Sequence, residues 1–267
     1  MIRCCMRSIY FVLSILLALL FALPAFAGCP VLDETGTPAL TAPADTTLVC
    51  HKGYAASVDN AALVPRWVAY KLTADHTLGC NIRENNFHPD EFLTGRRAVP
   101  ADYAKSGYDK GHQAPAEDFA FDAALLSDSF SMANMAPQLP GLNRAGWERL
   151  EETVRVWAWS RGAVVVLVGP FIGPNPPTIG HGVTVPDGFW KVLFDPATGE
   201  ALAFAMPQQP VAKGPLEPWE TTVAEGARRA GVMLPLPATV DRAAKPALWL
   251  ADVRKWHLAK KKACAGE

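Results

Sequence analysis

A short glycine-containing stretch near the middle of the chain holds the residues best suited to chemistry. Positions 106–115 read Ser-Gly-Tyr-Asp-Lys-Gly-His-Gln-Ala-Pro, so His112 follows an acid and a base in a turn-prone segment. A neutral imidazole accepts a proton near neutral pH, because the pKa of a free histidine is about 6.5. A single histidine is more often a hydrogen-bonded surface or core residue, so His112 needs further support before a catalytic role is assigned.

Polar residues downstream of this histidine suit the hydrolysis of a phosphodiester. Asn143 offers a neutral oxygen to a hard cation such as Mg²⁺, which keeps several waters and needs few protein ligands. Glu151 follows two helical turns later, so we expect it to contact the outer waters of a cation; its alternative role is an ion pair with Arg155. Asn134 also has an alternative role, as a turn residue that hydrogen-bonds to nearby backbone.

Taken in order, these motifs resemble those of the DNA/RNA non-specific endonuclease family of the ββα-metal type. That family has Asp-Arg-Gly-His, then Asn-x-x-Pro-Gln, then Asn-x-x-x-Trp leading to Leu-Glu. The corresponding segments here are 109–112, 134–138, 143–147 and 150–151. Upstream, Arg83 precedes a Phe-x-x-Asp segment, as the active-site arginine of the family does. The resemblance covers roughly residues 67–206.

The resemblance implies a metal-dependent endonuclease that hydrolyses the backbone of DNA and RNA with low sequence specificity, with one Mg²⁺ or Mn²⁺ ion per active site. Within it, His112 is the general base, Asn143 the metal ligand and Glu151 a supporting carboxylate. The remaining candidates are three phosphate-binding cations and one amide: Arg83, Lys110, Arg155 and Asn134. Position 110 departs from the usual arginine. Lysine supplies a point charge there but not the planar fork that clamps two phosphate oxygens.

Two other classes of function compete with this hypothesis. An exported protein that binds nucleic acid without cleaving it would need a basic groove, but not His112 together with Asn143. A serine or zinc hydrolase is less supported, because the sequence contains neither a Gly-x-Ser-x-Gly elbow nor a His-Glu-x-x-His helix.

The elements that must position these residues are predicted to form an α+β fold. We expect a mixed, mainly antiparallel central sheet with flanking helices and, from the resemblance, a ββα-metal active-site motif. Apolar and β-branched runs predict strands, apolar spacing predicts helices and a polar, proline-marked stretch predicts a loop. The strands are at 67–72, 164–168, 188–194 and 201–206, the helices at 143–159, 219–230 and 246–260, and the loop at 85–100. The basic run 260–262 is interpreted as a solvated helix end.

The N-terminal region predicts export. Two arginines, an apolar run and Ala-Phe-Ala identify residues 1–27 as a signal peptide, and no later stretch is apolar for long enough to span a membrane. The alternative is a lipoprotein anchored at Cys29. We expect an irregular arm at 28–49 and the endonuclease domain at 50–267, in a periplasmic or secreted protein whose oligomeric state the sequence does not predict.

Charge and cysteine content limit the classes of protein further. The formal net charge is −1 for the whole chain, and loss of Arg3 and Arg7 leaves 23 basic against 26 acidic side chains. Nucleic acid must therefore be bound by a local basic site rather than by bulk charge. Four cysteines follow the signal peptide and predict two disulfides with three possible connectivities, of which Cys29 to Cys50 would fix the arm.

Overall fold

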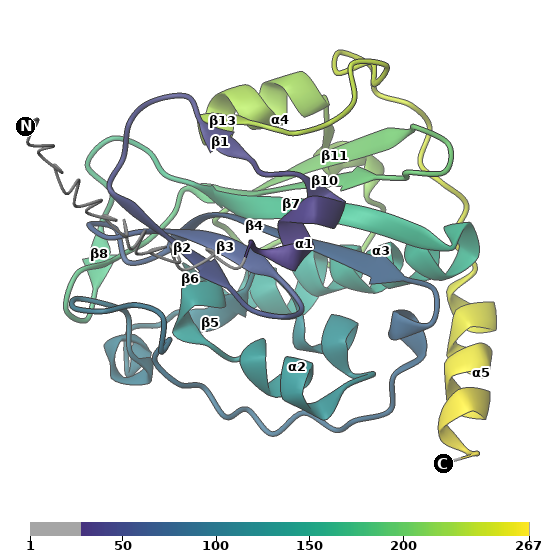
Figure 1. The fold of residues 1–267 in the computed structure, drawn as a ribbon, viewed down its shortest axis with the longest axis horizontal. Coiled ribbons are helices and arrows are strands. Elements are labelled where there is room, and N and C mark those ends of the chain that lie inside the picture. The colour runs from purple at the N-terminus through teal and green to yellow at the C-terminus, as the bar shows by residue number, and fades with distance from the viewer. Residues whose placement is uncertain (1–27, 267) are drawn as a thin grey trace, which may run out of the picture.

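A seven-stranded sheet forms the centre of the molecule (Figure 1). The computed structural model describes residues 28–266, so the predicted signal peptide lies outside the described residues. All neighbouring strands of the sheet pair antiparallel, which confirms the α+β fold with a mainly antiparallel sheet. The strand order is β12 (Glu220–Thr221), β11 (Ala201–Pro207), β10 (Gly188–Phe194), β7 (Ala163–Phe171), β4 (Pro65–Thr73), β3 (Ala55–Asp59) and β2 (Thr46–Cys50).

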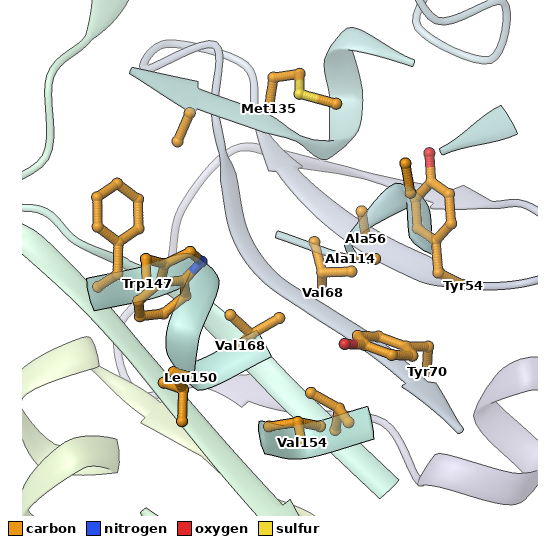
Figure 2. Packing of buried hydrophobic residues seen from close by; sticks show 14 of the residues in the cluster. Tyr54, Ala56, Val68, Tyr70, Ala114, Met135, Trp147, Leu150, Val154 and Val168 are labelled. Atoms are coloured by element: carbon orange, nitrogen blue, oxygen red, sulfur yellow. The ribbon is translucent and has the colours of Figure 1, made fainter. Parts of the chain in front are cut away.

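Both faces of this sheet are buried, which explains the continuous apolar run of β7. Alternate residues of a strand point to opposite faces, so Val166 and Val168 join one core while Val165 and Leu167 join the other. The first core is covered by α2 (Ala123–Asp128) and α3 (Glu148–Arg161), and the second by α1 (Pro30–Thr35) and α4 (Val223–Ala230). Figure 2 shows Leu150 and Val154 of α3 beside Val168 of the sheet.

The central strands β4 and β7 are neighbours although a long excursion, residues 74–162, separates them in sequence. Within it, β5 (Asp109–His112) and β6 (Met135–Gln138) form an antiparallel pair, and α3 follows. This is the expected ββα arrangement. The helix predicted at 143–159 begins differently, because a π-helical turn, η5 (Leu142–Trp147), precedes the regular α3. Single π-helical turns are often found at functional sites.

The remaining boundaries differ from the sequence-based ones at several places. The arm expected to be irregular contains α1, β1 (Ala39–Leu40) and most of β2, and β2 pairs along its whole length with β3. Backbone pairing thus overrides a composition rich in proline and threonine. The last two helices begin later than predicted, with α4 at Val223 and α5 at Val253 (Val253–Cys264).

Smaller elements complete the chain. They are η1 (His76–Leu78), η2 (Pro100–Tyr103), η3 (Ala116–Phe119), η4 (Met132–Asn134), β8 (Thr178–Ile179), β9 (Val183–Thr184), η6 (Glu217–Trp219) and β13 (Val232–Met233). Within residues 28–266, no helix is long and apolar enough to span a bilayer.

Two disulfides join distant parts of the chain. Cys29 pairs with Cys50, the connectivity that would fix the arm, and Cys80 pairs with Cys264. The second closes a loop of 184 residues and attaches α5 to the segment just after η1. In an oxidising compartment both would restrict the unfolded chain.

The close approach of β5 to β6 gives a first prediction, on stability. A Cβ atom on Gly111 would lie 2.6 Å from the Cβ of Gln138 and 3.0 Å from the carbonyl oxygen of Ala136. Gly111→Ala should therefore lower the free energy of unfolding by about 1–3 kcal/mol, the usual effect of overpacking. Urea denaturation measures it, with Gly214→Ala as the control because a Cβ there meets its nearest atom at 4.0 Å. Equal midpoints for the two variants would contradict this account of the hairpin.

Candidate active site

A polar pocket of about 390 Å³ lies where β5, η3, η5 and the first half of α3 meet. Six of the seven candidates identified in the sequence line it; Asn134 does not. The lining residues are Arg83, Lys110, His112, Pro115, Ala116, Glu117, Asn143, Arg144, Glu148, Glu151 and Arg155. All of them come from the excursion between β4 and β7.

His112 ends β5, and its imidazole forms a cluster with the rings of Phe87 and Phe130, whose own centroids lie 5.0 Å apart. The centroid of the imidazole lies 5.6 Å from that of the Phe87 ring and 5.0 Å from that of the Phe130 ring. Burial, together with the nearby charge of Arg83, lowers the pKa of His112 to about 3, so the ring is neutral at neutral pH. Its Nε2 atom is buried and has no hydrogen-bond partner among residues 28–266. His112 also lines the polar pocket, and a neutral imidazole there is able to accept a proton from a bound water.

Asn143 lies in η5 and is oriented by Asp109. The Nδ2 atom of Asn143 donates to Asp109 Oδ2 at 3.0 Å. An ionised carboxylate only accepts hydrogen bonds, so the amide nitrogen must face Asp109, and the amide oxygen is left available to a cation. The order of the motif pointed to Asn143, but the role of Asp109 depends on this contact between segments far apart in sequence.

Asp109 is kept ionised by its other partner. Arg144 donates to both carboxylate oxygens, at 2.8 Å from Nε and 2.6 Å from Nη2. Burial alone would raise the pKa of Asp109, but the hydrogen bonds from Arg144 and Asn143 outweigh burial and lower it. The acceptor that holds the asparagine therefore stays charged well below neutral pH.

Glu151 lies on the inner side of α3 with a buried lysine behind it. Lys191 Nζ is 3.9 Å from Glu151 Oε1 and 4.8 Å from the centroid of the Trp147 ring. Burial raises the pKa of Glu151, whereas Lys191 and Arg155 act in the opposite direction. Burial also lowers the pKa of Lys191, whose ammonium has no hydrogen-bond partner in the described part of the chain.

Sequence reasoning assigned no role to Lys191, although a signal was present. The strand predicted at 188–194 is apolar except for this lysine, and its neighbours Phe189 and Leu193 face the core beneath the site. A charged residue in that register must either be paired or lie near a functional group.

The cations of the pocket differ in how firmly they are held. Arg155 is buried and donates to Asp118 Oδ1 at 3.0 Å rather than pairing with Glu151, the alternative raised by the sequence. Arg83 is half exposed; it donates to Asn85 Oδ1 at 2.9 Å and lies 3.4 Å from Glu117.

Lys110 is held more loosely than these arginines. Its ammonium lies 4.7 Å from the centroid of the Phe87 ring and 5.8 Å from that of Tyr103, and it makes no ion pair with any residue the structure describes. Lys110 is therefore the cation of the pocket with the least competition from protein anions.

Glu117 lines the pocket, although the sequence did not reveal it. Burial would raise the pKa of its carboxyl, but Arg155 and Arg83 outweigh burial and lower it. Glu117 is thus an ionised group that spaces two arginines at the wall of the pocket.

Asn134 is fully buried and occupied by backbone groups. Its Oδ1 accepts from the Ala114 amide at 2.9 Å, and its Nδ2 donates to the carbonyl oxygens of Ala114 and Ser129, both at 2.8 Å. These bonds fix the segment that follows His112, which agrees with the backbone-binding alternative raised from the sequence.

The donor set fits a hard divalent cation that retains most of its waters. Residues 28–266 hold no group of three His, Cys, Asp or Glu side chains able to bind a metal ion. The amide oxygen of Asn143 and the carboxylate of Glu151 could face such a cation, and His112 lines the same pocket. Few protein oxygens together with water ligands are typical of Mg²⁺ sites.

A neutral histidine, an oriented asparagine and a buried glutamate on a ββα frame define a nuclease of the ββα-metal class. The chain matches the DNA/RNA non-specific endonuclease family over residues 33–242. It therefore belongs to that family, and the resemblance drawn from the motifs is confirmed.

Individual relatives and a solved structure support this membership. Mitochondrial endonuclease G of Bos taurus is 31% identical over 239 residues, which cover 83% of this chain and 80% of that protein. A nuclease of Nostoc sp. is 35% identical over 159 residues, 59% of this chain and 57% of that protein. A chain from the crystal structure of the EndoG/EndoGI complex superposes with a TM-score of 0.66 at 28% identity, over 72% of this chain and 87% of that one.

The contact between Asp109 and Asn143 gives a prediction on metal use. Asp109→Asn keeps the shape of the side chain but removes the anion that fixes the amide, so we expect activity or apparent affinity for Mg²⁺ to fall roughly 10- to 100-fold. Nicking rates at varied Mg²⁺ concentrations measure this. Arg144→Gln is the control, because it removes the arginine from Asp109 but leaves the bond to Asn143. A larger loss in Arg144→Gln would contradict the orienting role.

The pairing of Glu151 with Lys191 gives a prediction on pH dependence. Because Lys191 lowers the pKa of Glu151 against the effect of burial, Lys191→Met should raise that pKa further. Less of the carboxyl is then ionised at neutral pH, and the acid limb of turnover moves to higher pH. Turnover measured between about pH 6 and pH 9 tests this. Lys213→Met, which removes an exposed lysine paired with Glu148 at the pocket edge, should leave the limb in place; an unmoved limb in Lys191→Met would contradict the pairing.

Proposed function

We propose that this chain is an exported endonuclease that hydrolyses phosphodiester bonds of DNA and RNA with little sequence preference, using Mg²⁺ or Mn²⁺. The observation that carries the proposal is the neutral His112, which lines the same pocket as the oriented amide of Asn143. A protein that only binds nucleic acid needs cations, but it has no use for a proton acceptor set beside an oriented amide oxygen.

His112 acts as the general base. Its neutral imidazole accepts a proton from the attacking water as the oxygen of that water bonds to phosphorus. The bond from phosphorus to the 3′-oxygen then breaks, and the leaving oxygen takes up a proton from solvent. Because burial keeps the ring neutral well below pH 6.5, the base is available throughout the neutral range. Asn134 supports it indirectly, since its bonds to Ala114 hold the turn that follows the imidazole.

Asn143 and Glu151 would hold the divalent cation, the first through its amide oxygen and the second mainly through bound waters. When bound, such a cation neutralises charge on the phosphoryl and leaving oxygens. Glu151 contributes best when ionised, and Lys191 favours that state despite burial. Asp109 keeps the asparagine oriented before substrate arrives.

The cations of the pocket bind the phosphate groups. Lys110 makes no ion pair among the described residues and contacts one oxygen as a point charge, whereas the partly engaged Arg83 and Arg155 shape the wall. Contacts to the backbone position a nucleic acid but carry no base sequence, so the expected specificity is low.

Export is supported by the disulfides. Both bonds are of the kind that persists in an oxidising compartment. The sulfur of Cys29 is bonded to Cys50, which leaves no thiol for a lipid chain and favours a signal peptide over the lipoprotein alternative. We therefore place the protein in the periplasm or outside the cell.

A plasmid-nicking assay tests the function directly. Wild-type protein should nick plasmid with Mg²⁺ and stop in chelator, and His112→Ala should lower turnover roughly 100-fold or more, because the proton acceptor is lost. His257→Ala is the matched control: this histidine is exposed, pairs with Glu152 and does not line the pocket. Retention of DNA without cleavage by the wild type would favour the binding protein instead, and near wild-type nicking by His112→Ala would remove this residue from the mechanism.

A further inference from the structure

The last helix, α5, lies at one edge of the molecule (Figure 1), and its side chains carry a concentration of positive charge. Residues 253–264 contain no acidic side chain, in a chain whose formal net charge is −1, and they lie beyond the segment matched by the family. The five basic side chains are Arg254, Lys255, Lys260, Lys261 and Lys262. A basic run at a helix end is usually only solvated, so a binding role depends on which face of the helix each side chain occupies.

Lys260 differs from the others because it lies on the inner face of α5. Trp256, Lys260 and Cys264 are four residues apart and share one side of the helix. Trp256 is buried and donates to Thr77 Oγ1 at 3.3 Å, while Cys264 is bonded to Cys80. A lysine therefore occupies the middle of a stripe that is otherwise anchored to the protein body.

This inner face opens on a hollow that adjoins the active site. The hollow has a volume of about 150 Å³, and its lining includes Lys260, Asn81, Arg83 and Glu117. Arg83 and Glu117 also line the active-site pocket, so the two spaces share a wall. Lys260 is thus the next cation beyond Arg83 as one moves away from the catalytic histidine.

The surroundings of Lys260 favour an anion. It makes no ion pair within residues 28–266, and the centroid of the Trp256 ring lies 5.6 Å from its ammonium. Burial and then the charge of Arg155 lower the pKa of Lys260, so its ammonium stands close to a second cation, with Glu117 as a partial counter-charge. A bound phosphate would relieve that repulsion.

We propose that Lys260 binds a phosphate flanking the scissile one, and that α5 is a substrate-binding extension fixed in place by the Cys80–Cys264 disulfide. This inference rests on the proposed function, because it takes a nucleic-acid strand as the ligand. A strand continues past the scissile phosphate on both sides, and cations along its path add affinity that weakens with salt. The hollow beside Arg83 supplies such a path.

The test compares two lysines of the same helix on two substrates. Lys260→Gln and Lys262→Gln remove the same charge, but Lys262 is exposed on the far side of α5. The substrates are a single-stranded oligonucleotide and bis(p-nitrophenyl) phosphate, which has no flanking phosphate. For Lys260→Gln we expect KM on the oligonucleotide to rise roughly 3- to 10-fold at low salt. The slope of log KM against log salt concentration should fall by the amount expected for about one lost phosphate contact. Turnover on the oligonucleotide at saturation and activity on the small diester should both stay at the wild-type level.

Equal effects of the two substitutions on the oligonucleotide would show long-range attraction only and would overturn the proposal. A loss by Lys260→Gln on the small diester as large as that on the oligonucleotide would place the effect at the catalytic centre and would overturn it too. If the wild type cleaves neither substrate, the proposed function fails; fluorescence anisotropy of the labelled oligonucleotide in chelator then still decides between the two lysines.

A double replacement, Cys80→Ser with Cys264→Ser, tests the clamp. With α5 released, KM on the oligonucleotide should rise as it does in Lys260→Gln. Adding Lys260→Gln to the serine variant should raise KM little further, because both changes remove the same contact between Lys260 and the substrate. Circular dichroism melting confirms that each variant is folded. A serine variant with wild-type KM would show that the disulfide does not position α5 for substrate.

Discussion

Pairing between β4 and β7 is the constraint on which the site depends. The two strands run antiparallel from Val68 opposite Val168 to Thr73 opposite Ala163, and the amide of Ala74 donates to the carbonyl oxygen of Gly162 at 2.7 Å. Both ends of the excursion 74–162 are therefore held together by the central strands of the sheet. Every residue that lines the active-site pocket belongs to this excursion, so a long loop with fixed ends carries the chemistry on a rigid scaffold.

The sheet also contributes to the electrostatics of the site from beneath. Alternation along β10 puts Lys191 on the same face as the core under α3, where its ammonium meets Glu151. Neither charge is well solvated, so each depends on the other, and an apolar replacement of one leaves the second uncompensated. The same principle operates at Asp109, whose anion is satisfied by Arg144 and Asn143 together. Glu151 and Asn143 are thus each held by a charged residue, Lys191 or Asp109, that is not among the residues lining the pocket.

The sequence predicted those parts of the site that lie in ordered local motifs. His112 and Asn143 stood out because the surrounding spacing is specific, and the strands of the sheet followed from apolar runs bounded by turns. Lys191 and Glu117 were missed because their roles arise only when distant segments pack together. The π-helical turn was missed for the same reason: the Gly146 amide donates to the carbonyl oxygen of Val211 at 2.8 Å, a tertiary contact that no local propensity encodes. The N-terminal arm gained its order from strand pairing and a disulfide, which composition does not report.

The net charge of this chain does not favour nucleic acid, whereas the local arrangement of its cations does. An overall charge of −1 gives no general attraction to nucleic acid, so binding must depend on where the cations are held. Inside the pocket the arginines are already engaged with Asp118, Asn85, Glu117 or Asp109, which keeps them in place but weakens their attraction for phosphate. Cations without a protein anion then matter most. Lys110 supplies one in the pocket. The helix α5, which lies outside the family match and is fixed to the body by a disulfide, supplies another at the edge of the site.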